Sequence, residues 1–130
     1  MMKLEHVALN VSNPIEMAAW YVEHCKMKIV LKIDEPPFTR FIADSDNKTA
    51  LELYVNEDAP IPDYFQQHHL VYHNAFSVEE MDRTMNELIE AGASFVEEIN
   101  QDNGNRLVML RDPWGIPLQL VQRTRSQKWY

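Results

Sequence analysis

An internal repeat is the feature of this sequence that most constrains its fold. Shifting the chain by 67 residues lays 4–11, LEHVALNV, on 71–78, VYHNAFSV, with three identities in eight positions. The same shift lays 51–53, LEL, on 118–120, LQL. Two separate segments that agree at one offset indicate that the chain contains two copies of one structural unit.

Hydrophobic periodicity predicts the same element order in both copies: a strand, a helix and three strands. In the first copy, Asn13 and Pro14 are typical of a capped helix start, and the helix is expected to run to about Cys25. In the second copy, Ser77 and Glu80 have the spacing of a capping box, and Gly92 is expected to close the helix. Strands are predicted at residues 3–11, 27–33, 38–43, 49–55, 69–78, 94–99, 105–111 and 116–122.

These elements predict an α+β fold made of two tandem βαβββ modules. We expect the first module over residues 1–55 and the second over 67–123. Between them, 56–66 carry two prolines and three acidic residues without periodicity, which is typical of a linker. Residues 124–130 are expected to form a surface tail. Because 130 residues is the size of one ordinary domain, both modules are assigned to one domain overall.

Composition and charge exclude several classes of function. A net charge of −8 argues against a nucleic-acid-binding protein, because phosphate binding needs a basic patch. No stretch approaches the roughly 20 apolar residues of a membrane span, and the N-terminal residues lack the apolar core of a signal peptide. The single cysteine, Cys25, cannot form an intrachain disulfide. We therefore expect a cytoplasmic protein that binds neither nucleic acid nor membranes.

Side-chain alternation along the strands places a few polar groups on one face of each module. In the first strand, His6 and Ala8 point away from the apolar side chains, and Glu52 does the same between two leucines. His73 and Gln119 occupy the equivalent positions in the second module. If the modules pair about a pseudo-twofold axis, these histidine and oxygen-bearing side chains can converge.

Imidazole nitrogen together with carboxylate or amide oxygen suits a divalent ion such as Zn, Ni, Co, Fe or Mn. Two interpretations stay open on the pattern alone. A single strand histidine is often a hydrogen-bonded pocket residue, whereas four competent groups at equivalent positions favour a shared metal site. His69 is expected to share a face with His73 without binding metal. Arg40 and Arg106 could meet a substrate carboxylate, although exposed arginines need no such role.

The sequence resembles the vicinal oxygen chelate superfamily, which includes glyoxalase I, methylmalonyl-CoA epimerase, extradiol dioxygenases, fosfomycin-resistance enzymes and bleomycin-resistance proteins. The resemblance extends over about residues 3–122 and rests on His6 in HVALNV, Glu52 in ALELYV, His73 in HNAFSVEEMD and 111–120, RDPWGIPLQL. It implies a glyoxalase-like fold in which the curved mixed sheets of two βαβββ modules surround a cleft. It also implies a homodimer.

The same resemblance implies one divalent metal ion with four ligands: His6, Glu52, His73 and Gln119. In most metal enzymes of the superfamily the last position is Glu, so Gln119 counts against the dioxygenase and fosfomycin branches. The glyoxalase I and epimerase branches use four ligands and accept Gln at some of them. The implied function is a metal-dependent lyase or isomerase that acts on a small oxygen-chelating substrate, with Glu52 as the catalytic base.

A function of a different class also fits. The bleomycin-resistance branch binds drugs without a metal and typically lacks these ligands. The small size and acidity of this chain fit that branch, whereas its four ligand-type side chains argue against it. The alternative expectation is therefore a metal-free protein that sequesters an antibiotic or a metabolite.

Overall fold

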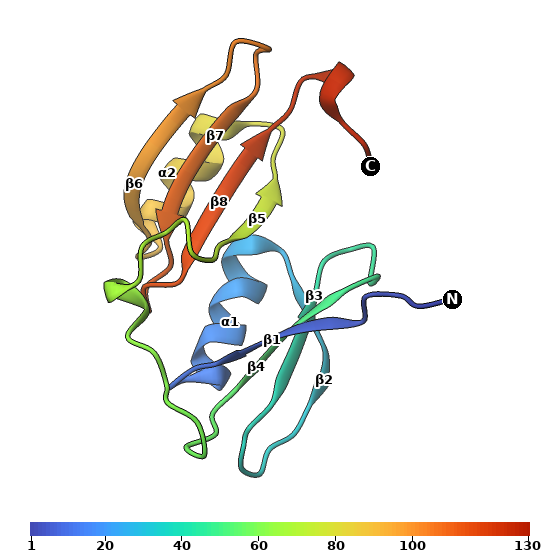
Figure 1. Ribbon diagram of the computed structural model, residues 1–130, viewed down its shortest axis with the longest axis vertical. Helices are drawn as coiled ribbons and strands as arrows, with labels where there is room; N and C mark the ends of the chain where they lie inside the picture. Colours follow the sequence, from blue (N-terminus) through green and yellow to red (C-terminus); the bar gives the residue numbers. More distant parts are fainter. The chain divides into compact units, whose positions relative to one another are not determined.

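Each half of the chain folds into one helix and one four-stranded sheet (Figure 1). The computed structural model describes residues 1–130, which form the units Met1–Pro62 and Asp63–Tyr130. Both units have the order strand, helix and three strands, so the prediction of two βαβββ modules in an α+β fold is confirmed. The boundary between the units lies inside the segment 56–66. No helix has both the length and the apolar character that a membrane span requires.

The first unit pairs its first strand with its last. Strand β1 (His6–Asn10) runs parallel to β4 (Ala50–Tyr54), and β3 (Arg40–Ala43) and β2 (Lys28–Lys32) extend the sheet in antiparallel fashion. The helix α1 (Pro14–Cys25) packs against β2, β3 and β4. The strand order is therefore β1-β4-β3-β2, in a mixed sheet.

The second unit repeats this plan. Strand β5 (Asn74–Ser77) runs parallel to β8 (Pro117–Gln122), and β7 (Arg106–Arg111) and β6 (Ser94–Asn100) follow in antiparallel fashion. The helix α2 (Met81–Glu90) contacts β8 and lies behind the sheet in Figure 1. The strand order β5-β8-β7-β6 is the counterpart of that in the first unit.

The pairing of the first and last strands of each unit confirms the internal repeat. Ala8 lies opposite Glu52 in the first unit, and Ala75 lies opposite Gln119 in the second. Both residue pairs are related by the 67-residue offset. His6 and His73, each two residues before the alanine of its unit, therefore hold equivalent positions.

The third strand of each unit departs from this offset by one residue. Phe41 lies opposite Glu52, whereas Met109 lies opposite Gln119, so these two residues correspond although they are 68 positions apart. The difference arises in the following turn, which has six residues between β3 and β4 and five between β7 and β8. The turn absorbs the mismatch, and the register between the first and last strands of each unit is preserved.

Each sheet buries the face that its helix covers. Alternate strand residues on this face are apolar, and removing each of their side chains from water contributes about 1.5–3 kcal/mol. In both units the helix adds apolar side chains to the same core. The core residues with at most 2% exposure include Met17, Tyr21, Ile42, Leu53, Met81, Leu88, Val108, Leu110, Leu118 and Leu120.

Both helices form close to their predicted positions, but the capping box predicted at Ser77 is wrong. Asn13 does occupy the N-cap position of α1, as predicted, although its side chain makes no hydrogen bond to the first turn. Ser77 remains in β5, where it pairs with Val121, and its hydroxyl hydrogen-bonds the Tyr130 hydroxyl instead of the helix. The helix α2 therefore begins only at Met81, beyond the reach of Ser77.

The strand predicted at 69–78 begins later, at Asn74. A turn precedes it, in which the N–H of Val71 donates to the carbonyl of His68 at 3.0 Å. The run LVY has the composition of a strand, but Val71 is 72% exposed, so most of its side chain is unpacked. Without such packing, the local turn prevails over strand propensity.

Arg40 is buried, contrary to the expectation of an exposed arginine. It is 5% exposed, and its guanidinium donates to the carbonyl oxygens of Ile33 at 2.8 Å and Thr39 at 3.1 Å. It also pairs with Asp34 at 2.8 Å. Arg40 thus holds the chain between β2 and β3 in place, and its donors are already used within the fold.

The segments outside the sheets contain two short 3-10 helices, η1 (Tyr64–Gln66) and η2 (Arg125–Gln127). After η2 the tail returns to the end of β5, where the Lys128 ammonium pairs with Glu79 at 2.9 Å. Trp129 in this tail is 82% exposed.

The turn into β8 generates a prediction about stability. Asp112 is 1% exposed, and its Oδ1 accepts hydrogen bonds from the N–H groups of Trp114 and Ile116, both at 2.9 Å. Replacing Asp112 by Ala leaves both amides without this acceptor, so the free energy of unfolding in urea should fall by about 1–3 kcal/mol. Asp112→Asn retains an acceptor oxygen and should lose less. Equal losses in the two variants would contradict this assignment.

Candidate metal centre

The sheet face opposite the helix carries the predicted ligands in each unit, and we call it the site face. In the first unit it consists of His6 and Ala8 on β1, Phe41 on β3 and Glu52 on β4. The His6 ring meets the Phe41 ring edge to face, with the ring centres 5.3 Å apart. The His6 ring therefore contacts the apolar Phe41 ring and shares its sheet face with the Glu52 carboxylate.

The first unit brings two predicted ligands together. His6 Nε2 lies 3.7 Å from Glu52 Oε1, and their side chains are 39% and 20% exposed. Two ligands that bind one tetrahedral Zn²⁺ ion at about 2.0–2.2 Å lie roughly 3.3–3.6 Å from each other. The observed separation is close to that range, and the nitrogen and oxygen atoms are donors that such an ion accepts.

Glu5 is a site residue that the sequence analysis missed. It precedes β1, where strand alternation does not apply, and its carboxylate accepts a hydrogen bond from Nδ1–H of His6. This hydrogen bond, the charge of Glu5 and the charge of Glu52 raise the pKa of His6, against a lowering by desolvation. With Nδ1 engaged, the free nitrogen of the neutral ring is Nε2.

The site face of the second unit is a row of residues paired across four strands. Ala75 on β5 lies opposite Gln119 on β8, which lies opposite Met109 on β7, which lies opposite Glu97 on β6. His73 directly precedes β5 and shares the face of Ala75 by alternation. His73 therefore lies immediately before the strand that runs parallel to the strand of Gln119. His6 is itself the first residue of β1, which runs parallel to the strand of Glu52.

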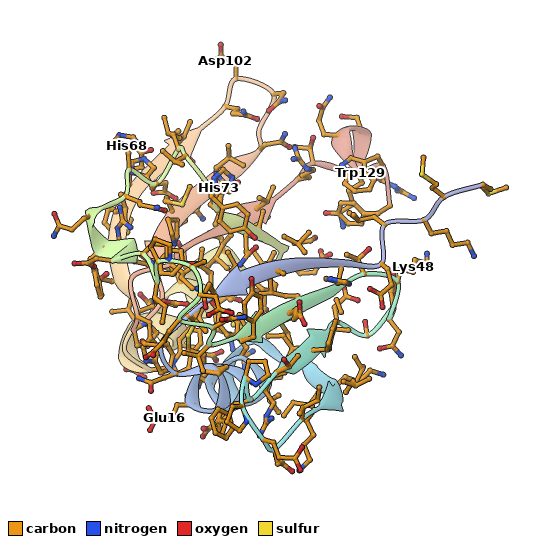
Figure 2. The ribbon with its side chains drawn as sticks, turned by 60° about the horizontal axis from the view of Figure 1, so that its bottom comes forward. Glu16, Lys48, His68, His73, Asp102 and Trp129 are labelled. Atoms are coloured by element: carbon orange, nitrogen blue, oxygen red, sulfur yellow. The ribbon has the colours of Figure 1, made fainter.

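His69 lies in the turn before β5 and not on a strand with His73, so the expectation of a shared strand face is wrong. Its Nε2–H donates to Glu97 Oε1 at 2.9 Å, and its ring stacks on His68 at 4.3 Å. Its carbonyl oxygen accepts a hydrogen bond from Nδ1 of His73 at 3.4 Å. Figure 2 shows His68 at the periphery of the second unit and His73 closer to its strands.

In both His6 and His73 the Nδ1 atom is engaged by a hydrogen-bond partner, which leaves Nε2 as the free nitrogen. A carboxylate engages Nδ1 of His6, and a backbone carbonyl engages Nδ1 of His73. Within neither unit do three or more His, Cys, Asp or Glu side chains gather to hold a metal ion. Each unit carries one of the predicted histidines and one carboxylate or amide on its site face. Such a donor set fits the divalent ions named above.

Arg106, the other arginine considered for substrate binding, is engaged by acidic side chains. Its guanidinium pairs with Asp82 at 2.9 Å and with Glu98 at 2.5 Å. Hydrogen bonds to these two carboxylates raise the pKa of Arg106 further above its already high value. The arginine thus links β7 to β6 and to the first turn of α2.

The chain belongs to the Glyoxalase/Bleomycin resistance protein/Dioxygenase superfamily, whose family model matches residues 3–120. Among curated proteins, none matches the chain. Solved structures, in contrast, share its fold over nearly the whole length.

A superfamily member from Sphaerobacter thermophilus DSM 20745 has a TM-score of 0.74 and 18% identity, with 95% of this chain and 98% of that chain covered. An antibiotic binding protein from Streptomyces sp. CB03234 has a TM-score of 0.73 and 17% identity, with the same coverages of 95% and 98%. A glyoxalase family protein from Enterococcus faecalis has a TM-score of 0.70 and 23% identity, covering 94% and 98%. At these identities the similarity establishes the fold.

The contact between Glu5 and His6 generates a prediction about pH. Replacing Glu5 by Gln removes the charge that stabilises the imidazolium, so the pKa of His6 should fall toward the ordinary histidine value. NMR titration of the ring in chelator-treated protein measures this change. Glu52→Gln is the matched comparison and should lower the pKa less, because Glu52 is the weaker contributor. A His6 pKa unchanged by Glu5→Gln would refute the assignment.

Proposed function

We propose that this protein is a metal-dependent lyase or isomerase of the glyoxalase class that acts on a small oxygen-chelating substrate. One observation carries the proposal, and it holds in both units. Ala8 lies opposite Glu52 and Ala75 lies opposite Gln119 across the parallel strand pair. A histidine, His6 or His73, stands two residues before each alanine. The proposed ligands of one divalent ion are His6, Glu52, His73 and Gln119. The ion is drawn from Zn, Ni, Co, Fe and Mn.

The ligand types divide the proposed chemistry between the two units. When bound, a divalent ion supplies Lewis-acid polarisation of neighbouring substrate oxygens. Glu52 accepts a proton from the carbon beside a substrate carbonyl and returns it to the product, since a carboxylate can do both. Gln119 cannot take this role, because an amide has no proton to exchange near neutral pH. The apolar ring of Phe41 lies beside His6 and opposite Glu52.

Metal titration tests the proposed ligands. His6→Ala and His73→Ala each remove one nitrogen ligand, so the affinity for Zn²⁺ measured against a competing chelator should fall roughly 100-fold or more. His24→Ala is the matched control, because His24 lies in the last turn of α1 and contacts Glu23 at 3.7 Å. Its affinity should equal that of the unmodified protein. Equal Zn²⁺ affinity in all three variants would contradict the ligand assignment.

Turnover tests the role of Glu52. Glu52→Gln keeps an oxygen ligand and removes the base, so metal affinity should stay within about tenfold while turnover drops by about 100-fold or more. Hemithioacetals of α-keto-aldehydes are the first substrates to screen. Gln119→Glu, which adds a second carboxylate in the equivalent position, provides the reciprocal comparison. Full activity of Glu52→Gln would exclude the catalytic role.

A second candidate is a metal-free protein that sequesters an antibiotic or a metabolite. Two observations favour it: the shared fold of the antibiotic binding protein from Streptomyces, and the apolar residues Phe41 and Met109 on the two site faces. Calorimetry with a panel of antibiotics, run with and without chelator, separates the candidates. Tight binding that persists in chelator, with no turnover of any screened substrate, supports sequestration.

A further inference from the structure

A β-bulge turns Glu97 onto the site face of the second unit. Phe95 lies opposite Leu110, which is buried on the helix side, whereas Glu97 lies opposite Met109 on the site face. In a regular strand, residues two apart share a face, so this change of side requires the irregularity that the pairing shows between them. The bulge therefore places a carboxylate in the same row as Gln119.

The segment before β5 is fastened to the sheet at two places. Near its start, the Arg111 guanidinium donates to the carbonyl oxygens of Tyr64 at 2.8 Å and Gln67 at 2.7 Å. At its turn, His69 is held by Glu97 at 2.9 Å. The His69 side chain is only 14% exposed. The position of this turn is therefore set by the sheet.

The second attachment leads directly to a predicted ligand. The carboxylate of Glu97 can only accept, so the His69 nitrogen that faces it carries the proton. The carbonyl of His69 can likewise only accept, so Nδ1 of His73 carries a proton too. In the neutral His73 ring this leaves Nε2 with a free lone pair, which is the form that binds a metal ion.

We propose that Glu97 and His69 are positioning residues that hold the His73 imidazole in its Nδ1–H tautomer. The inference rests on the proposed metal-binding function, which gives the free Nε2 its use. Glu97 does not touch His73 but fixes the His69 ring, and the His69 backbone then orients His73. In the first unit Glu5 does this directly, and the residue at the equivalent position of the repeat is Tyr72, whose hydroxyl donates to Asn74 instead.

The test uses His69→Ala, Glu97→Ala and the conservative Glu97→Gln in the full chain, with circular dichroism to check the fold. Long-range proton–nitrogen NMR on chelator-treated protein, at a pH where the rings are neutral, reports the His73 tautomer without any metal. A Zn²⁺ titration against a competing chelator then reports affinity. His24→Ala serves as the control in both measurements.

In the unmodified protein and in His24→Ala, His73 should show the Nδ1–H pattern. In His69→Ala and Glu97→Ala it should shift toward a mixture with Nε2–H, and Zn²⁺ affinity should fall by about 10- to 100-fold. Glu97→Gln keeps an oxygen acceptor for His69 and should restore both readouts to near the unmodified values. If His69→Ala does not fold, the two Glu97 variants decide the question.

An unchanged His73 tautomer in both alanine variants would overturn the inference. The inference would also be overturned if Glu97→Gln behaved like Glu97→Ala. The hydrogen bond between His69 and residue 97 would then not be what sets the His73 tautomer. If the unmodified protein binds none of the divalent ions Zn, Ni, Co, Fe and Mn, the proposed function fails, and the tautomer measurement still decides whether the positioning holds.

Discussion

Parallel pairing of the first and last strands of each unit is the constraint on which the site depends. Strand residues alternate between faces, so a slip of one residue would move Glu52 or Gln119 to the helix side. Leu53 and Leu118, both fully buried, oppose that slip because it would expose them. The apolar core therefore fixes the positions of the polar side chains on the opposite face.

The two units share this backbone plan but differ in the electrical character of their polar pairs. In the first unit, two carboxylates, those of Glu52 and Glu5, lie beside His6. The second has a neutral amide at Gln119. Its carboxylate, Glu97, hydrogen-bonds His69 and does not contact His73. The repeat thus gives one unit the group that can exchange a proton and gives the other a neutral oxygen donor.

Much of the fold and of the candidate site follows from the sequence, because strand alternation and the repeat are local patterns that the core preserves. His6 lies 3.7 Å from Glu52, and Ala75, two residues after His73, lies opposite Gln119, which is the register that alternation predicts. The errors lie where distant contacts override local preference: Ser77 stays in a strand and bonds the tail. Glu97 has no sequence signal, because a bulge decides its face.

The same parallel pairing also determines when each half of the site comes into existence during folding. His6 and Glu52 are separated by 46 residues of sequence, as are His73 and Gln119. The polar pair of a unit is thus assembled only when its last strand docks beside its first, after the helix and the intervening hairpin have closed a long loop. During synthesis each histidine emerges well before its oxygen partner, so a chain that ends short of β8 carries His73 without Gln119.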